Sequence, residues 1–415
     1  MKGLVEKISL SLERPTPTDK QADRERLVDA LIGHTGIDIP VVIDLTVLKD
    51  VPRVLRDHDF FVTVTSCFTG DALRFIALDK EVSCGVAVDI GTTNIVASLY
   101  DLADGRRIVQ RERENPQTAI ALDVLSRVQV AMGGRGRELH ALLMEGMNAL
   151  IGDLCAAGGI RPGDIDCVVC AGNTIMTHFL LDLPVENIPL EPYIPAAHHV
   201  DPFLPGEIGL SMNSRGLVHV FPNVGSYVGG DIVAGILSSG LYRDREPSFL
   251  IDVGTNAEIV LGCNEWIIVG AGAAGPALEG GIAEIGMRAT EGAVDHVRIS
   301  EEGRHVVVST IGNGEPKGIC GSGMIELVSE LYKTGVINEQ GKFTASAPRL
   351  IHDEFYKGFI VSDTGDRQLI IKDRDIDNFL RSKAAMFSAL YVIVSSVGLR
   401  FKDISQVYVS GAFGT

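Results

Sequence analysis

Clustered cysteines are missing from this sequence. Its seven cysteines are scattered over 415 residues, at Cys67, Cys84, Cys155, Cys167, Cys170, Cys263 and Cys320. Such an odd, scattered set in a large chain is typical of free thiols in a reducing compartment. Cys167 and Cys170 have the spacing of a redox or metal pair, but their surroundings predict a buried strand. Because side chains three apart on a strand point to opposite faces, we expect two packed thiols that diverge.

Positive charge and long apolar runs are also scarce. Lys and Arg number 37 and Asp and Glu number 54, which gives a net charge of −17. A nucleic-acid backbone or an anionic membrane surface would be repelled on average, so neither is an expected partner. Polar residues interrupt every apolar run before the ~20 residues that a membrane span needs, and the first residues do not resemble a signal sequence. We therefore expect a soluble, cytoplasmic protein.

Two short polar turns stand out against this background. Asp89 to Asn94 (Asp-Ile-Gly-Thr-Thr-Asn) joins two apolar runs, and Asp252 to Asn256 (Asp-Val-Gly-Thr-Asn) does the same later in the chain. Glycine lets backbone N–H groups approach phosphate oxygens, threonine hydroxyls can donate to them, and an aspartate can hold Mg²⁺ through water. One copy could be an ordinary hairpin turn. Two copies instead indicate two similar halves that grip a nucleotide from both sides.

Shifts in composition divide the chain into three expected domains. Residues 1–82 show strand-like alternation and one amphipathic helix but no catalytic motif, so we expect a small α/β domain with a structural or dimerisation role. Residues 83–223 contain the first hairpin, followed by helices and a strand. Residues 224–415 contain a helix rich in small residues, the second hairpin and two glycine-rich turns. The fold class that follows is α/β.

Periodicity and turn residues locate the main elements. Helices are expected at 19–32, 121–130, 138–157, 224–241 and 373–398. Strands are expected at 5–12, 41–43, 60–65 and 165–172, two-stranded hairpins at 86–100 and 249–261, and a strand ending in a loop at 404–415. The proline-rich stretch 184–222 lacks sustained periodicity and is expected to be a connection. Glycine-rich turns at 270–281 and 317–326 run into helix starts, where bare amides favour an anion.

Four motifs together resemble one superfamily of ATPases. Asp89 to Asn94 is similar to the first phosphate loop, and Asp252 to Asn256 to the second, of the acetate and sugar kinase, heat-shock chaperone and actin (ASKHA) superfamily. Gly225 to Gly240 resembles its first connecting helix, and Val407 to Gly414 its adenosine loop. The resemblance implies two ribonuclease-H-like, actin-type subdomains with ATP and Mg²⁺ in the cleft between them.

Within that superfamily, the sequence is similar to the reductive activators of corrinoid proteins, ATPases that help return an inactive Co(II) corrinoid to Co(I). The matching segments are 251–258, 273–280, 286–289, 318–323 and 410–414. Residues 1–82 look like the middle, dimer-forming domain of the same proteins. The implied partner is a corrinoid (iron–sulfur) protein or a corrinoid methyltransferase component, with a homodimer through residues 1–82 as a further expectation. Trp266 and the few other aromatics offer no platform for a corrin ring, so the corrinoid should arrive on its own protein.

The resemblance also implies site residues. Asp89 and Asp252 are the candidates for water-mediated contact with Mg²⁺. Nucleotide contacts are implied for these two and for Gly91, Thr92, Thr93, Asn94, Gly254, Thr255, Asn256, Gly321, Ser322, Gly323, Gly411, Ala412 and Gly414. The carboxylate that orients the attacking water is Glu258 or Asp231, although each could equally be a helix cap or a salt-bridge partner.

Two features depart from the family pattern. The activators usually carry an iron–sulfur domain, whereas this sequence has no run of cysteines that could ligate a cluster. The family continues past the adenosine loop with a second connecting helix, whereas this sequence stops at Thr415, as a fragment would. The expected cofactors are therefore ATP and Mg²⁺, without a ligand set for an iron–sulfur cluster.

Three functions stay open on the sequence alone. The leading hypothesis is ATP-dependent reductive activation of a corrinoid protein in support of methyl transfer, with nucleotide-driven closure and slow, partner-stimulated hydrolysis. A small-molecule kinase of the same superfamily would need a general base aimed at its acceptor. A non-catalytic, nucleotide-regulated binding module would need no turnover.

Overall fold

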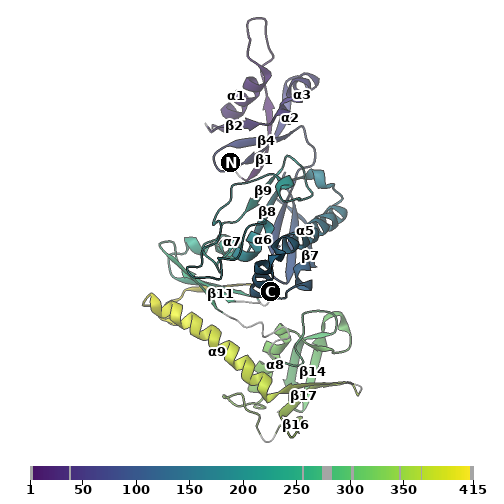
Figure 1. Cartoon of the computed structure of the whole chain (residues 1–415), viewed down its shortest axis with the longest axis vertical. Coiled ribbons are helices and arrows are strands. Elements are labelled where there is room, and N and C mark those ends of the chain that lie inside the picture. The colour runs from purple at the N-terminus through teal and green to yellow at the C-terminus, as the bar shows by residue number, and fades with distance from the viewer. Residues whose placement is uncertain are drawn as a thin grey trace. The chain divides into compact units, whose positions relative to one another are not determined.

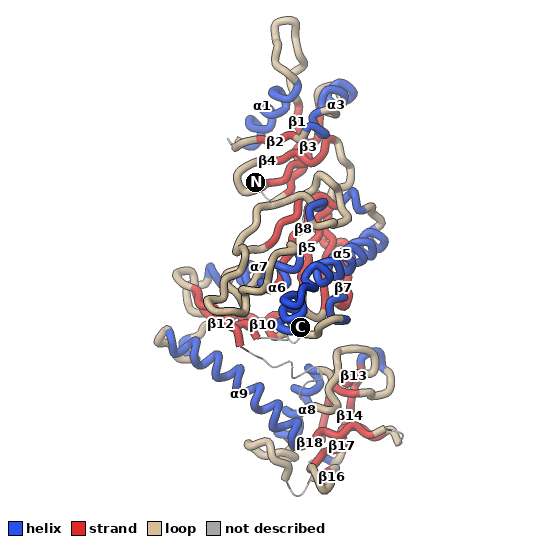
Figure 2. The backbone as a smooth tube through the Cα atoms, in the orientation of Figure 1, coloured by secondary structure: helices blue, strands red, loops and turns tan. Residues whose placement is uncertain are grey.

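The chain forms two compact α/β units, Met1–Ala234 and Gly235–Thr415, in the computed structural model (Figures 1 and 2). The structure describes residues 3–36, 39–254, 257–272, 283–300, 303–344, 347–365 and 367–411. Both units mix helices with sheets, which confirms the expected α/β class. Within the described ranges, none of the helices combines the length and the apolar character that a bilayer crossing requires.

The first unit opens with a small sheet in the strand order β1-β3-β4-β2. Its strands are β1 (Val5–Ser11), β2 (Val41–Ile43), β3 (Phe61–Phe68) and β4 (Leu73–Leu78), and its helices are α1 (Asp23–Thr35), α2 (Leu45–Leu48) and α3 (Val51–Asp57). Apolar side chains of the three helices pack with those of one sheet face into a core of their own. Helix α1 begins later than residue 19, because the Asp19 carboxylate accepts a hydrogen bond from the Gln21 backbone N–H (2.9 Å) and forms a turn.

The rest of the first unit is built on a five-stranded sheet in the order β7-β6-β5-β8-β9. The strands are β5 (Cys84–Ile90), β6 (Asn94–Asp101), β7 (Arg107–Glu114), β8 (Ile165–Gly172) and β9 (Leu217–Val220), and the helices are α4 (Val124–Val130), α5 (Gly136–Gly158) and α6 (Thr174–Leu180). Strands β5, β6 and β7 form an antiparallel meander, and β8 and then β9 add in parallel on the other side of β5. Strand β9 lies in the stretch for which the sequence predicts only a connection.

The second unit repeats this order in a four-stranded sheet, β12-β11-β10-β19. Its strands are β10 (Ser248–Val253), β11 (Ala257–Gly262), β12 (Ile267–Gly272) and β19 (Gln406–Ser410), and the helix before β19 is α9 (Asp373–Ser396). Again a meander of three antiparallel strands is followed by a parallel strand beside the first one. In each unit one long helix, α5 or α9, precedes the parallel strand and packs on the meander. The shared order confirms the two ribonuclease-H-like halves.

Two small sheets complete the second unit. They contain β13 (Ala293–Ser300), β14 (His305–Thr310) and β15 (Gly318–Ile319), and β16 (Leu350–His352), β17 (Lys357–Asp363) and β18 (Gln368–Lys372). Helix α8 (Gly321–Lys333) packs on β13, and both sheets share one apolar core with it. These six strands do not follow from the patterns in the sequence.

Short helical turns and the linking helix fill the remaining connections. They are η1 (Pro116–Ala119), the π-helical η2 (Ala131–Arg135), η3 (Pro162–Asp164), η4 (Pro205–Glu207), η5 (Leu241–Arg243), η8 (Ile311–Asn313), η9 (Phe401–Asp403) and α7 (Gly230–Ser239). Helix α7 begins after the residue predicted from sequence, because Gly225 and Val228 pair as a β-bridge ahead of it.

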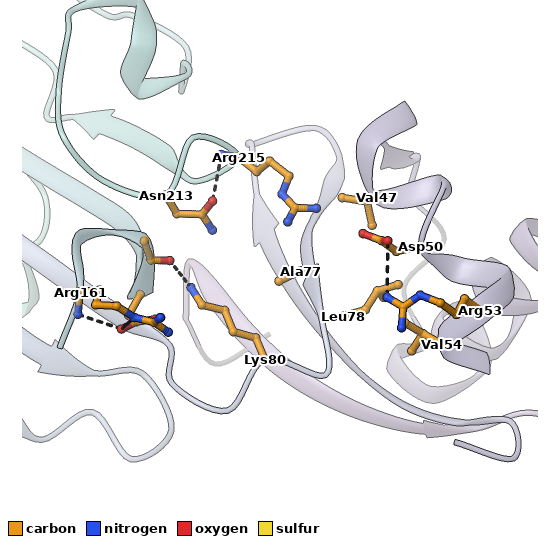
Figure 3. A pocket seen from close by; sticks show the side chains of 12 residues that line it. Val47, Asp50, Arg53, Val54, Ala77, Leu78, Lys80, Arg161, Asn213 and Arg215 are labelled. Carbon is orange, nitrogen blue, oxygen red and sulfur yellow. Dashed lines mark hydrogen bonds and ion pairs between the residues drawn. The ribbon is translucent and has the colours of Figure 1, made fainter. Parts of the chain in front are cut away.

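Asp166 joins the small sheet of the first unit to the five-stranded sheet. Its fully buried carboxylate accepts hydrogen bonds from Lys80 Nζ (2.5 Å), Ser83 Oγ (2.6 Å) and Asn213 Nδ2 (2.6 Å). A pocket of about 360 Å³ opens beside this cluster, and Figure 3 shows Lys80 and Asn213 in its wall together with Arg215. The carboxylate therefore holds the connection between β4 and β5, which joins the two sheets, to the loop that precedes β9.

We expect Asp166→Asn to weaken this junction. The substitution removes the negative charge but keeps the size, and the loss of charge-assisted hydrogen bonds should lower the free energy of unfolding by about 1–3 kcal/mol. Urea unfolding followed by circular dichroism measures the change. Asp104→Asn is the matched control, since Asp104 is exposed, and should change the free energy by less than about 0.5 kcal/mol. Equal effects of the two substitutions would contradict the role of Asp166.

Candidate functional site

The first candidate loop is the tight turn between β5 and β6. Asp89 is exposed near the end of β5, where it pairs with Val96. A Cβ atom at Gly91 would lie 2.5 Å from the Asn94 carbonyl oxygen, so only glycine fits the turn as it is folded. The structure thus places Asp89, Gly91 and Asn94 in one short hairpin, with Thr92 and Thr93 at its tip.

Three successive carbonyl groups of this turn accept hydrogen bonds from inside the unit. The bonds run from Asn115 Nδ2 to the Gly91 carbonyl (2.9 Å), from Arg127 Nη2 to the Thr92 carbonyl (2.6 Å) and from the Asn115 backbone N–H to the Thr93 carbonyl (2.7 Å). In a trans peptide the C=O and the following N–H point in opposite directions. The N–H groups of Thr92, Thr93 and Asn94 are therefore directed away from these donors. Successive N–H groups directed the same way form an anion-binding concavity.

Arg127 on α4 holds the tip of this hairpin, and the sequence analysis missed it. Its side chain is fully buried and also donates to Gln117 Oε1 (2.9 Å) and to the Ala121 carbonyl (3.1 Å). Burial lowers the pKa of Arg127 to about 10, so the guanidinium stays charged at neutral pH. The available signal was a lone arginine within the largely apolar stretch 124–130. A buried cation with neutral partners under the hairpin also adds positive potential beneath an anion.

Asn173 connects the hairpin with the start of α7. Its side chain caps α6 by accepting the Met176 backbone N–H (2.9 Å), and its Nδ2 lies 3.5 Å from Thr92 Oγ1. A Cβ atom at Gly229 would lie 2.3 Å from the Asn173 Cα atom, so the residues that lead into α7 pack directly on Asn173. Asp231 lies in the first turn of α7, where its Oδ1 accepts the Ile232 backbone N–H (2.8 Å).

In the second unit, the β10–β11 hairpin lies beside the end of β19, the strand that leads into the adenosine-like loop. Asp252 on β10 is the register partner of Glu258 on β11 and of Ser410 on β19. Ser410 Oγ donates to Asp252 Oδ2 (3.0 Å). Burial raises the pKa of Asp252, and the hydrogen bond from Ser410 opposes that rise. Asp252 and Glu258, the two candidate carboxylates of this unit, are thus cross-strand neighbours at the hairpin end of the sheet.

Gly411 follows directly and touches the same carboxylate. Its φ angle is 88°, and a Cβ atom there would lie 2.4 Å from the Val253 carbonyl oxygen and 2.6 Å from Asp252 Oδ1. A side chain at this position would be strained and would clash with the aspartate. Gly254 ends the described part of the second hairpin. Four predicted contact residues lie outside the described residues: Thr255, Asn256, Ala412 and Gly414.

The glycine-rich turn at Gly321 lies in a different part of the second unit. Gly321, Ser322 and Gly323 form the first turn of α8, and Ser322 is exposed there. A Cβ atom at Gly323 would lie 2.2 Å from the Val294 carbonyl oxygen, so this glycine lets α8 pack against β13. This close packing explains why a glycine stands at position 323. Its contact with a nucleotide stays a prediction. The other predicted glycine turn falls largely on residues 273–282, outside the described residues.

The two candidates for the hydrolytic carboxylate belong to different units. Asp231 is part of the first unit and Glu258 part of the second. Among the residues that the structure describes, no group of three or more His, Cys, Asp or Glu side chains is arranged to hold a metal ion. A Mg²⁺ contact through water from Asp89 and Asp252 stays a prediction.

Comparison with known families assigns consecutive parts of the chain to one kind of protein. Residues 1–82 match a model described as the RACo linker region, residues 84–244 one described as the RACo middle region, and residues 246–415 one described as the C-terminal domain of RACo, the ASKHA domain. The dimerisation role expected for residues 1–82 stays a prediction.

Individual relatives agree with these models. The corrinoid activation enzyme RamQ of Eubacterium limosum is 31% identical over 347 residues, which cover 80% of this chain and 58% of RamQ. A protein of Methanosarcina barkeri described as [Co(II) methylated amine-specific corrinoid protein] reductase is 27% identical over 215 residues, 46% of this chain and 37% of that protein. The chain thus spans less than two thirds of the length of either of these relatives.

A solved structure of a reductive activator for a corrinoid, iron–sulfur protein superposes with a TM-score of 0.87 and 36% identity. The superposition covers 99% of this chain and 67% of that one. The fold is therefore shared along almost the whole of this chain. The chain belongs to the family of reductive activators of corrinoid proteins, and its C-terminal domain is an ASKHA domain of the nucleotide-binding ATPase type.

Proposed function

We propose that this chain binds Mg-ATP and couples nucleotide-driven conformational change to the reductive activation of a corrinoid protein, from Co(II) to Co(I), in support of methyl transfer. The names of the relatives support the kind of partner and the outcome. The partner supplies the corrinoid on its own polypeptide. The three-part division at residues 82 and 223, with a dimerisation role for residues 1–82, belongs to the same proposal.

The observation that carries the proposal is the hairpin tip at Thr92 and Thr93. Its carbonyl groups are held by Asn115 and Arg127, which turns three consecutive N–H groups the other way. An ordinary surface hairpin needs no buried guanidinium under its tip, and burying one costs free energy. A phosphate group on the N–H side would gain from both the amides and the positive charge.

The acidic residues fit a role with Mg²⁺. Asp252 is a partly buried carboxylate whose pKa is raised by desolvation, and Glu258 is its register partner on the next strand. A divalent cation held through water would offset the cost of keeping a negative charge there. Bound Mg²⁺ supplies charge neutralisation for the phosphates. Asp89 is the corresponding residue of the first hairpin, and Glu258 or Asp231 would orient the attacking water.

We propose that another component of the corrinoid activation system transfers the electron. All seven cysteines of the chain are free and buried, so none of the residues described here is proposed as the carrier of the electron. The work of this chain is a change of conformation, and a slow ATPase suits such a role better than a fast one.

Isothermal titration with Mg-ATP, followed by ATPase assays with and without a Co(II) corrinoid protein, tests the proposal. We expect saturable Mg-ATP binding, slow basal hydrolysis and a severalfold rise in rate when the corrinoid protein is added. Small acids and sugars should leave ADP release unchanged, whereas a kinase of the same superfamily would respond to one of them. Absence of Mg-ATP binding, or hydrolysis indifferent to corrinoid proteins, would overturn the proposal.

A further inference from the structure

Two cysteines and a histidine from three strands meet inside the first unit. Cys67 lies on β3 of the small sheet, and Cys167 and His219 lie on β8 and β9 of the five-stranded sheet. Cys67 Sγ is 3.4 Å from His219 Nε2. Both cysteines are buried in the small apolar cluster that packs one sheet on the other. The cluster therefore brings together two thiols that are far apart in sequence.

Alternation along β8 separates Cys167 from its neighbour Cys170. Cys167 and Val169 pack toward the small sheet, whereas Val168 and Cys170 pack into the main core of the unit. The expected divergence of these two thiols is confirmed. Cys167 instead shares the small apolar cluster with Cys67. The neighbouring thiol is also the leading cause of the shift in the pKa of each of these two cysteines.

The surroundings of the pair favour one thiolate beside one thiol. The interaction with the Cys167 thiol and with His219 lowers the pKa of Cys67 to about 6, whereas Cys67 and burial raise the pKa of Cys167. Burial alone raises the pKa of Cys170 to about 12. Since the thiolate is the reactive form of cysteine, Cys67 differs in kind from Cys167 and Cys170, whose pKa values are raised.

A cavity of about 1300 Å³ reaches this place in the first unit. Its wall contains Cys167 and Val169 together with residues of β1, from Val5 to Ser9. A molecule as small as a peroxide can therefore reach the Cys167 side of the pair from the cavity. Cys170 faces the opposite core and does not line this cavity.

We propose that Cys67 and Cys167 form an oxidisable dithiol that hydrogen peroxide converts into a disulfide between the two sheets of the first unit. A thiolate of the pair attacks one peroxide oxygen, the O–O bond breaks, and the released hydroxide takes up a proton to leave as water. The sulfenic acid that forms is attacked by the second sulfur, the S–O bond breaks, the S–S bond forms, and a second water leaves. Two thiols are oxidised and one peroxide is reduced to two waters.

His219 is a positioning residue in this scheme. Its imidazole is within hydrogen-bonding distance of Cys67 and favours the thiolate there. The disulfide would tie β3 to β8 and so fix residues of the small sheet covalently to the five-stranded sheet. A bond across 100 positions of the chain removes more freedom from the unfolded state than a short-range bond does.

Thiol counting and peptide mapping test the proposal on the unmodified 415-residue chain. The chain is treated with hydrogen peroxide at neutral pH, unfolded, alkylated and digested without reduction. Seven thiols react before treatment, as the sequence has seven cysteines. We expect five to react after treatment, together with one new cross-linked peptide that contains Cys67 and Cys167. Recovery of seven thiols, or a disulfide between another pair, would overturn the proposal.

Variants separate the pair from its neighbours. Cys170→Ala is the matched control and should still lose two thiols, whereas Cys67→Ala and Cys167→Ala should each give no cross-link. His219→Asn should slow disulfide formation by at least about tenfold at pH 7, because less of the pair would be ionised. Dithiothreitol should restore all thiols in the wild-type chain. An unchanged rate in His219→Asn would contradict the role given to the imidazole.

Discussion

Asp252→Asn is expected to lower ATP hydrolysis by about 100-fold or more, because it removes the charge that would hold Mg²⁺ in the second unit. The amide keeps the size of the side chain and can still accept the hydrogen bond from Ser410 Oγ. Steady-state release of phosphate at saturating Mg-ATP measures the effect. Asp363→Asn is the matched control, since Asp363 is exposed on β17, and its rate should equal that of the wild type.

The same substitution should leave the protein without nucleotide at least as stable as the wild type. Burial raises the pKa of Asp252 above its unfolded value, so the folded state binds this proton more tightly than the unfolded state. The contribution of Asp252 to stability is therefore least favourable above its folded pKa and improves as pH falls through it. Asn removes this pH-dependent term. A loss of both activity and stability would show that Asp252 is structural instead.

Arg127→Met is expected to lower the free energy of unfolding by about 3–5 kcal/mol, because it leaves three acceptors without their donor at about 1–3 kcal/mol each. The Thr92 carbonyl and Gln117 Oε1 would both lose their donor inside the unit. Urea unfolding of the chain measures the stability. Arg113→Met serves as the control, because Arg113 is a partly exposed arginine that pairs with Asp153, and should cost less than about 1 kcal/mol.

Arg127→Lys separates the role in stability from the role at the hairpin. Lysine keeps the charge but cannot make the forked contacts to Thr92 and Gln117 at once. We expect an intermediate stability and a Mg-ATP affinity that is weaker by about tenfold, because the hairpin tip would no longer be fixed. Wild-type affinity in a folded Arg127→Lys chain would show that the guanidinium does not position the phosphate loop.

The sequence predicted the two hairpins of the candidate site, because each is local in the chain. The turn at Gly91 and the one after Asp252 are short motifs whose chemistry can be seen in a few consecutive residues, and both hairpins form where expected. The role of Arg127 could not be predicted from the sequence, because it depends on a contact with Thr92, which lies 35 positions away. A lone charge in a helix is usually a solvated one, and only the fold shows this one to be buried.

Long-range packing also explains the other differences between the predictions from sequence and the structure. The divergence of Cys167 and Cys170 follows from strand geometry and was predictable, whereas Cys67 is 100 positions from Cys167 and no local pattern links them. Strands β14 and β16 are short and half exposed, so they carry little apolar periodicity. Their pairing in the small sheets depends on neighbours that a local pattern does not reveal.

The pairing of β10 with β19 has a consequence for synthesis of the protein. Asp252 and Ser410 are 158 positions apart, and β19 is one of the two neighbours of β10 in the sheet. The ribosome must therefore release almost the entire second unit before the sheet edge around Asp252 can form. Closing so long a loop is slow and gains contacts only at the end. The first hairpin can form early, whereas the sheet around the second is complete only when β19 has been synthesised.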